Sequence, residues 1–229
     1  MIIFLFFIYL CIIISKPQNI SYYSYFLNLK EQDYEEGLKD WFKYSTKNDL
    51  NLENPKTYNE KIQWIKLYDI DELKGNLTDK YLVRNWIKKK IGDKYLIPLL
   101  GVWDNFDEIK FEKLPEKFVL KCNHGSGMNI IFLNKNKINI SDAKKKINNW
   151  MKINYAYYQG LELQYKNIKR KIIAEEYIEN ENNNLIDYKL WCFNGKVDTI
   201  MVISDRNNEK KYSFYDRDWN LLPFLLFKL

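Results

Sequence analysis

A short polar loop that contains two glycines and follows a lysine is the part of the sequence most suited to chemistry. It spans Lys121 to Asn129 (Lys-Cys-Asn-His-Gly-Ser-Gly-Met-Asn) and includes the only histidine of the chain, His124. Glycines allow a backbone to approach a phosphate closely and to turn its N–H groups toward it. A lysine at the mouth of such a loop adds a positive charge that suits phosphate. The loop therefore predicts a phosphate site, and a hairpin closed by a tight glycine turn is the simpler alternative.

Other common arrangements of catalytic and binding residues are missing from the sequence. It contains neither of two well-known phosphate loops, G-x-x-x-x-G-K-[ST] and G-x-G-x-x-G. A single histidine excludes a multi-histidine metal site and leaves His124 as the only base for a Ser-His-Asp triad, and no activated nucleophile is evident near it. The three cysteines, Cys11, Cys122 and Cys192, form no C-x-x-C pair. That spacing excludes a zinc ribbon and a disulfide framework and fits a reducing compartment.

The composition is that of a folded chain with one large domain or two modest ones. Hydrophobic residues make up 46% and aromatic residues 17% of the 229 residues, which supplies a sizeable core. The formal net charge is +6, but acidic residues are interleaved with the basic ones. The longest basic runs, 88–90 and 144–146, lie in helical patterns, so we interpret them as solvated helix faces and expect no nucleic-acid partner.

The first residues form an unbroken apolar run from Met1 to Ile14. This run is short for a membrane span, which needs about 20 residues. It resembles the apolar part of a signal peptide, but no basic segment precedes it and no small-x-small cleavage site follows it. Lys16 and Lys30 come next, so insertion would leave the rest of the chain in the cytoplasm. We expect an uncleaved segment associated with the inner face of the membrane; an interfacial anchor and a wrongly chosen start codon are the alternatives.

Two apolar segments rich in β-forming residues flank the loop and must position it, so we expect a strand-loop-strand over 118–133. Thr57 and Glu60 form a capping box that predicts the start of a helix. Asn194-Gly195 between two apolar runs predicts a hairpin. The expected helices are 33–44, a helix from Thr57, a helix from Thr78 or Asp79 to Gly92, and 141–152. The other expected strands are 95–100, 171–178, 187–193, 196–204 and 211–215. Helices followed by mixed strands and helices predict an α+β fold or a mixed α/β sandwich.

Three segments then follow one another in an order that resembles a known superfamily. They are Asp79–Arg84 (DKYLVR), the loop 121–129 and Ile172–Ile178 (IIAEEYI). This order resembles the ATP-grasp superfamily, and more closely the TupA-like ATP-grasp proteins of bacterial cell-wall and surface-polysaccharide clusters. Further matching segments are 54–68, 78–103, 114–131, 187–196 (DYKLWCFNGK) and 215–220 (YDRDWN). The resemblance covers residues 50–223 and is specific for the family, but much less so for the substrate.

The resemblance implies that ATP and Mg²⁺ are held between two small α+β lobes. It places Lys121 at the α- and β-phosphates and makes the backbone of 125–128 a flap over them. The segment 175–178 becomes the hinge that reads adenine, and Glu179 or Glu181 the partner of the ribose. Lys189 becomes the candidate catalytic residue, near phosphate or the acyl substrate. The implied cofactor-binding residues are Lys80, Lys121, His124, Gly125, Ser126, Gly127, Glu175, Glu176, Tyr177, Ile178, Glu181 and Asp187.

Structural roles are open for several of these residues. His124 is as well explained by a hydrogen bond within the loop as by a ligand contact. Glu175 and Glu176 point to opposite faces of a strand, so at least one of them is expected to be solvated or salt-bridged. Lys80 and Arg84 are a turn apart and are also compatible with a helix surface.

The resemblance implies ligation of a carboxylate to an amine through an acyl phosphate, chemistry that needs positioning and cations more than a nucleophile. ATP-grasp enzymes hold Mg²⁺ with late carboxylates and usually an asparagine. No D…E-x-N arrangement precedes Leu229, so the metal ligands stay unknown. An incomplete second lobe and an inactive remnant are therefore expected as one outcome, beside an active ligase. The implied division is 1–15 (hydrophobic segment), 16–113 (helical region), 114–178 (first lobe) and 179–229 (partial second lobe).

Two other functions fit parts of the sequence. A glycosyltransferase-like protein of polysaccharide biosynthesis would use a D-x-D metal motif, which Asp216-Arg217-Asp218 spells. It follows no convincing nucleotide-binding β-α-β unit. A non-catalytic, membrane-associated scaffold is the third hypothesis. Binding of ATP rather than a nucleotide sugar, and turnover rather than binding alone, distinguish the three.

Overall fold

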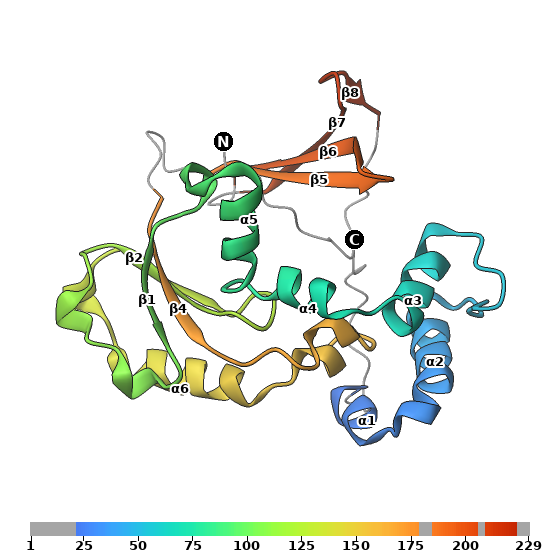
Figure 1. Ribbon diagram of the computed structural model, residues 1–229, viewed down its shortest axis with the longest axis horizontal. Coiled ribbons are helices and arrows are strands. Elements are labelled where there is room, and N and C mark those ends of the chain that lie inside the picture. Colours follow the sequence, from blue (N-terminus) through green and yellow to red (C-terminus); the bar gives the residue numbers. More distant parts are fainter. Residues whose placement is uncertain (1–21, 179–184, 206–208, 224–229) are drawn as a thin grey trace. The chain divides into compact units, whose positions relative to one another are not determined.

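A computed structural model describes residues 22–178, 185–205 and 209–223 of the chain (Figure 1). Within these residues it contains six α-helices and two four-stranded antiparallel sheets, which is the predicted α+β composition. The chain divides into two compact units, and we describe each by itself. The loop-bearing unit comprises described residues 22–92 and 98–177. The β5–β8 unit comprises described residues 93–97, 178, 185–205 and 209–223.

All six helices belong to the loop-bearing unit. They are α1 (Tyr22–Asn28), α2 (Tyr34–Thr46), α3 (Tyr58–Tyr68), α4 (Glu72–Thr78), α5 (Val83–Ile91) and α6 (Ile140–Lys152). Short 3-10 helices occupy 31–33, 106–108, 111–113, 135–137, 155–157 and 163–165 in this unit and 93–95 in the other. Among the residues described, no helix is long and apolar enough to cross a membrane. The predicted membrane-associated segment, Met1 to Ile14, lies outside these residues.

The predicted start of α3 is confirmed in detail. Thr57 accepts a hydrogen bond from the Glu60 N–H, and the Glu60 carboxylate accepts one from the Thr57 N–H, so both halves of the capping box are present. The helix expected from Thr78 or Asp79 differs. Thr78 ends α4, which was not predicted, and α5 begins only at Val83. The physical reason is Asp79, whose Oδ1 accepts from the N–H groups of Tyr81 (2.7 Å) and Leu82 (3.2 Å) and holds a separate turn before α5.

The sheet of the loop-bearing unit has the strand order β1-β4-β2-β3. Its strands are β1 (Leu99–Trp103), β2 (Phe118–Cys122), β3 (Asn129–Phe132) and β4 (Ile172–Glu176). The strand-loop-strand over 118–133 and the strand within 171–178 are confirmed. The strand expected at 95–100 begins later, at Leu99. Pro98, which has no N–H to donate, precedes it, and the Pro98 carbonyl accepts from the Glu176 N–H at 3.1 Å.

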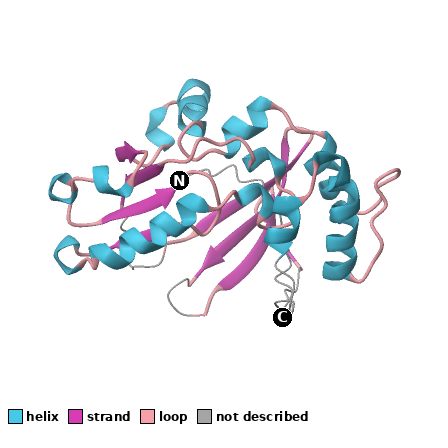
Figure 2. Cartoon of the chain, turned by 90° about the horizontal axis from the view of Figure 1, so that it is seen from below, coloured by secondary structure: helices cyan, strands magenta, loops and turns pink. Residues whose placement is uncertain are grey.

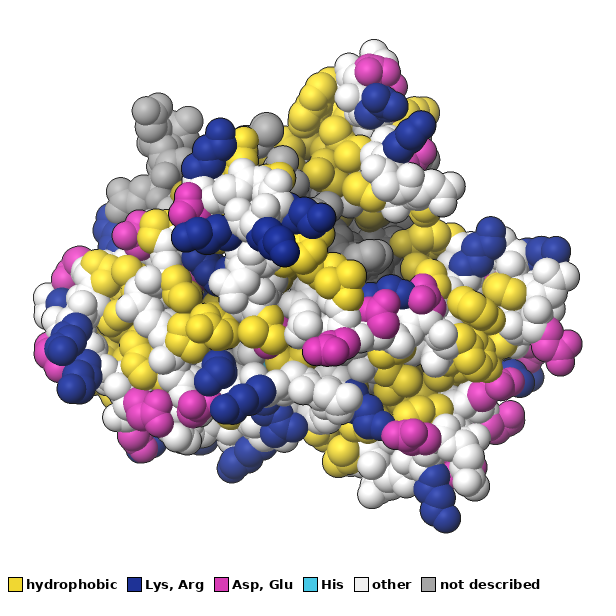
Figure 3. Space-filling model, viewed as in Figure 1, with side chains coloured by type: hydrophobic (Ala, Val, Ile, Leu, Met, Phe, Trp, Pro, Cys, Tyr) yellow, Lys and Arg dark blue, Asp and Glu magenta, His cyan; other side chains and the backbone are white. Residues whose placement is uncertain are grey.

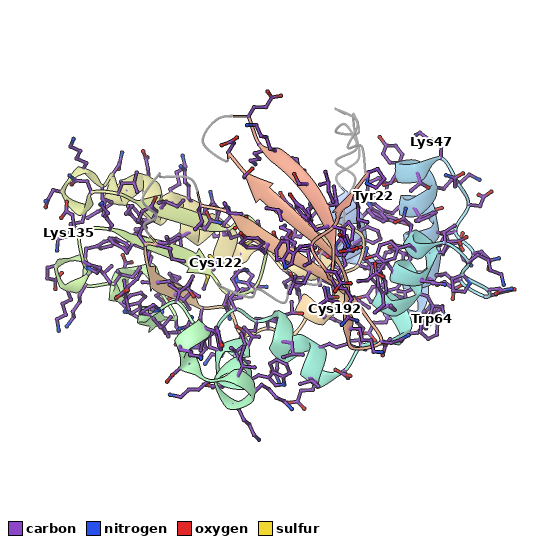
Figure 4. The ribbon with its side chains drawn as sticks, turned by 90° about the horizontal axis from the view of Figure 1, so that it is seen from above. Tyr22, Lys47, Trp64, Cys122, Lys135 and Cys192 are labelled. Atoms are coloured by element: carbon purple, nitrogen blue, oxygen red, sulfur yellow. The ribbon has the colours of Figure 1, made fainter. Side chains whose placement is uncertain are left out.

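One face of the sheet packs on α6 (Figures 1 and 2), and the opposite face carries the ion-paired residues Lys121 and Glu175. On β2, Phe118, Leu120 and Cys122 are fully buried and pack with Ala143 and Ile147 of α6. Cys122, labelled in Figure 4, is the last residue of that strand. Because side chains alternate along a strand, Lys121 points to the face away from α6.

The pairing of β2 with β4 brings Glu175 onto the same face as Lys121. Val119 is opposite Glu175, and Lys121 is opposite Ile173. Residues directly opposite one another in an antiparallel pair share a face, and diagonal neighbours remain within reach of long side chains. The sheet register alone therefore places the Lys121 ammonium beside the Glu175 carboxylate.

The helices α1 and α2 share a core with the segment 156–161. Phe26, Leu38 and Phe42 pack with Ala156, Tyr157 and Leu161.

A buried lysine of α3 reinforces this junction. Lys66 is 2% exposed, donates to the Gly160 carbonyl (2.8 Å) and to Gln63 Oε1 (2.9 Å), and lies 4.8 Å from the ring centroid of Trp41. Gly160 has φ +68°, and a Cβ there would lie 2.8 Å from the Trp41 ring. The turn thus requires glycine both for its conformation and for space.

The β5–β8 unit contains β5 (Asp187–Phe193), β6 (Lys196–Ser204), β7 (Lys211–Asp216) and β8 (Leu221–Leu222), in that order. The predicted strands and hairpin are confirmed. Asn194 and Gly195 both have positive φ (50° and 74°), as a two-residue type I′ turn requires. Met201, Ile203 and Phe214 form the core, with Trp191 and Leu222 against it. Figure 3 shows the described residues of both units, and basic and acidic side chains are interleaved over the face that it displays.

Candidate functional site

The glycine loop that follows Lys121 is closed by backbone and packing contacts. The Cys122 N–H donates to the Met128 carbonyl at 3.0 Å and joins the two ends of the loop. Gly125 is buried, and a Cβ there would lie 2.6 Å from Tyr155 Cδ2 and 2.8 Å from Met128 Sδ. Gly127 has φ +73° and is open to solvent, as is Ser126. The connection between β2 and β3 is thus the loop 123–128 rather than a tight turn, and its first glycine is required by packing.

Alanine at Gly125 is expected to destabilise the chain by about 1–3 kcal/mol, because overpacking forces neighbouring side chains or backbone to move. Gly75→Ala is the matched control, since its Cβ would meet nothing closer than 3.6 Å in the middle of α4. That change should stabilise by about 0.5–1 kcal/mol. Urea unfolding of both variants checks this pair; equal midpoints for the two would contradict the packing argument.

Three cations surround one buried carboxylate on the face away from α6. Glu175 is 6% exposed. Its Oε1 accepts from Arg84 Nη1 at 2.9 Å, and its Oε2 accepts from Lys121 Nζ. Lys80 Nζ donates to the Gly125 carbonyl. Arg84 and Lys80 thus do more than cover a helix surface: Arg84 is an ion-pair partner, and Lys80 lies in the turn before α5 and contacts the loop.

Lys80 is the least compensated of these charges. Burial, and then the nearby charge of Lys121, lower the pKa of Lys80 to about 8. The group is still mostly protonated at pH 7, but its nearest hydrogen-bond acceptor is the neutral Gly125 carbonyl. The cluster contains three cations and two carboxylates. The cations are Lys80, Arg84 and Lys121, and the carboxylates are Glu175 and Asp79. An anion placed beside Lys80 would be stabilised by these charges in a largely desolvated setting.

His124 anchors the loop to α6. It is 2% exposed, and its Nε2 lies 3.1 Å from the Trp150 carbonyl oxygen. A carbonyl only accepts, so Nε2 carries the proton and Nδ1, which has no partner among the described residues, is an acceptor. Burial lowers the pKa of His124 to about 4, so the ring is neutral at pH 7. In this state the imidazole offers an anion neither a charge nor a donor.

The remaining predicted site residues fall into three groups. Glu176 is exposed, and Tyr177 is half-buried after β4 in the loop-bearing unit. Ile178, Asp187 and Lys189 belong to the β5–β8 unit. Asp187 and Lys189 are two residues apart on β5, and burial lowers the pKa of Lys189. The two candidates for the ribose contact, Glu179 and Glu181, lie outside the described residues. Sequence reasoning did not single out Asn123, although it stands inside the loop, and treated Asp79 only as a helix cap and as the first residue of the matching segment 79–84.

The described part of the chain contains no group of three or more His, Cys, Asp or Glu side chains that could hold a metal ion. Asp216 of the D-x-D sequence instead holds its own turn. Its carboxylate accepts from the N–H groups of Asp218 (2.9 Å) and Asn220 (2.8 Å) and from the Asn220 side chain (2.8 Å).

Fold and site together describe an α+β protein with a cationic cluster beside a glycine loop. Comparison with protein families gives a match to the TupA-like ATPgrasp family over residues 60–228. The match covers most of the chain, and the protein therefore belongs to the TupA-like ATPgrasp family and is ATP-grasp ligase-like. Comparisons with curated proteins and with solved structures gave no significant match.

Proposed function

We propose that the loop-bearing unit binds the phosphates of ATP on the sheet face opposite α6. The observation that carries this proposal is the cluster of Lys80, Arg84 and Lys121 around Glu175, beside a loop that contains glycine. Hydrogen bonds between charged partners are about twice as strong as neutral ones, so phosphate oxygens suit these cations. Membership of the TupA-like ATPgrasp family supports the same ligand.

The cations differ in the role that we assign to them. Lys121 is shared between Glu175 and the α- and β-phosphates, because its ammonium has three donors and Glu175 takes one. The Lys80 ammonium either leaves the Gly125 carbonyl for a phosphate oxygen or donates to both. Arg84 stays on Glu175 and keeps that carboxylate from taking up both lysines. Backbone N–H groups of 125–128 close over the phosphates, and His124 holds the loop to α6.

We assign the base and sugar of ATP to the hinge. Backbone groups of Glu176, Tyr177 and Ile178 would read the adenine edge, and Glu181 would hold the ribose hydroxyls. Mg²⁺, which family members generally use, would neutralise phosphate charge when bound. Magnesium prefers carboxylate and phosphate oxygens, and we assign none of the described side chains as its ligand.

We propose that the reaction joins a carboxylate to an amine at the expense of ATP. Phosphoryl transfer depends on positioning and positive charge, which this chain supplies without a nucleophilic triad. Lys189 of β5 is our candidate for contact with the transferred phosphoryl group or the acyl substrate, and Asp187 lies beside it on the same strand. We place the substrates in cell-surface polysaccharide biosynthesis and the protein at the cytoplasmic side of the membrane, associated through Met1 to Ile14.

Thermal unfolding with and without Mg·AMP-PNP tests the proposal. A ligand present at about a hundred times its Kd stabilises a protein by roughly 2.7 kcal/mol, so the midpoint should rise clearly. Lys121→Ala should abolish most of that rise, because it removes a charged phosphate contact. Lys137→Ala, at an exposed lysine of the 3-10 helix 135–137, should leave it unchanged.

Two results would overturn the assignment. A well-folded wild-type chain with no shift at any magnesium concentration would remove ATP as the ligand. A shift produced by UDP-glucose but not by Mg·AMP-PNP would favour the glycosyltransferase-like alternative. Nucleotide binding without any turnover, by contrast, would keep the site and assign the chain to a non-catalytic role.

A further inference from the structure

Asn123 is fully buried and uses every hydrogen-bonding group that it has. Its backbone N–H donates to the Lys171 carbonyl (3.0 Å), and its own carbonyl accepts from the Lys80 N–H (3.2 Å). The two amide protons of Nδ2 go to Asp79 Oδ2 (2.9 Å) and to the Lys169 carbonyl (3.0 Å). Oδ1 accepts from the Lys171 N–H at 2.7 Å. The residue therefore ties three segments together: the turn that bears Lys80, the end of β2, and the chain that enters β4.

Asp79, which is 2% exposed, extends this connection to α5. One carboxylate oxygen receives Asn123 Nδ2, and the other receives the N–H groups of Tyr81 and Leu82. Its backbone carbonyl accepts from the Val83 N–H at 3.0 Å, at the first residue of α5. The position of the helix that carries Arg84 is thus fixed, through Asp79, to the strand that carries Lys121.

Neither side chain is placed to bind a ligand. Both are nearly inaccessible, and the hydrogen bonds above occupy both oxygens of the Asp79 carboxylate and all three side-chain bonds of Asn123. Their effect is instead on the three cations. Lys80 adjoins Asp79 and donates its N–H to the Asn123 carbonyl, Lys121 is two residues before Asn123, and Asp79 holds the turn that leads into α5. Groups that are held in place before a ligand arrives lose less entropy on binding.

We propose that Asn123 and Asp79 are positioning residues that hold Lys80, Arg84 and Lys121 in the geometry needed for phosphate. This inference rests on the proposed ATP site. It also explains why an amide is needed at residue 123. An aspartate there would face the Asp79 carboxylate and the Lys169 carbonyl with no proton to share. An apolar side chain would leave the buried Asp79 carboxylate, the Lys169 carbonyl and the Lys171 N–H without this partner.

The test uses Asn123→Asp, Asp79→Asn and the double exchange of both residues in the full chain. Each single change removes the Asn123–Asp79 hydrogen bond, and we expect the Kd of Mg·AMP-PNP to rise about 10- to 100-fold, the range for one bond to a charged group. In the double variant, an amide at 79 again faces a carboxylate at 123, so affinity should recover by at least about tenfold from Asn123→Asp. Asp79→Asn keeps an oxygen for the turn and is the milder variant if Asn123→Asp does not fold.

A second readout needs no nucleotide. The rate of acetylation of individual lysines is followed by mass spectrometry against pH in the ligand-free chain, which gives the pKa of Lys80. That pKa should be near 8 in the wild type and should rise in both single variants, because a lysine that leaves its desolvated position regains water. Unchanged Kd and an unchanged Lys80 pKa in folded single variants would overturn the inference. If the wild type binds no nucleotide, the proposed function fails separately, and the pKa of Lys80 alone then decides whether Asn123 and Asp79 position this lysine.

Discussion

Glu175→Ala is expected to lower the free energy of unfolding by about 3–5 kcal/mol, the usual cost of removing one partner from a buried ion pair. The carboxylate is the acceptor that Arg84 and Lys121 share, and both pairs are largely shielded from water. Without it, these two cations and Lys80 face one another on one side of the sheet. Repulsion in a partly desolvated setting then adds to the loss of two charge-assisted hydrogen bonds.

The next residue supplies the control. Glu176 points away from Glu175 and is exposed, so Glu176→Ala should change stability by no more than about 0.5 kcal/mol. Added phosphate should also stabilise Glu175→Ala more than the wild type, because an anion can replace the missing charge. Urea unfolding with and without phosphate, at constant ionic strength set by chloride, measures both effects. Equal losses for the two glutamate variants would contradict the charge argument.

Glu162→Gln is expected to stabilise the chain by about 3 kcal/mol at pH 8 and to have little effect at pH 4. Burial raises the pKa of Glu162 from 4.5 to about 7, and the charge of Lys66 only partly opposes that shift. The folded chain therefore holds this proton more tightly than the unfolded chain. Its contribution to stability is fully present below about pH 4.5 and is lost as the pH rises through about 7. Glutamine keeps the neutral, protonated shape at every pH.

His124 acts in the opposite direction. Its pKa is lowered from 6.5 to about 4, so the folded chain resists protonation, and stability is lost as the pH falls from 6.5 toward 4. The two effects offset each other between about pH 4.5 and 6.5 in the wild type. Glu162→Gln should therefore expose a loss of stability on acidification that the wild type conceals.

Chemical denaturation at pH 4, 6 and 8 tests this pair of titrations, with Glu112→Gln as the control at an exposed glutamate. The control should follow the wild type at every pH. A Glu162→Gln curve that runs parallel to the wild-type curve would show that Glu162 is ionised normally in the folded chain.

The structural features that were predicted correctly from the sequence are determined by residues close together in the chain. The capping box of α3, the Asn194-Gly195 turn and the strand alternation of β2 are local patterns, and each was confirmed. The alternation also predicted that at least one of Glu175 and Glu176 would be solvated or salt-bridged; Glu175 is salt-bridged and Glu176 is exposed. Helix α4 was missed because glycine and asparagine lie within Glu72–Thr78, and both are poor helix formers. Its cap, Asp71, carries the only strong local signal.

The rest of the site depends on contacts between distant residues. Arg84 and Glu175 are 91 positions apart, and Asn123 and Asp79 are 44 apart. No periodic pattern or short motif links such pairs, so a helix surface was the role that local patterns indicated for Arg84. Asn123 lies inside the glycine loop, but its residue type alone does not distinguish a turn residue from a buried junction. The sheet register and the turn before α5 were needed to bring these residues together.

The capped start of α3 has a consequence for shortened versions of this protein. The family match begins at Glu60, inside that helix, and would be a natural place to trim the chain for expression. Such a fragment would lack Thr57 and every side chain of α1 and α2, so Leu161 and Tyr157 would lose the hydrophobic surface that covers them. Lys66 would keep its carbonyl partners and lose the Trp41 ring above it. The border of sequence similarity is thus not a folding border, and fragments for crystallisation or NMR should start no later than Tyr22.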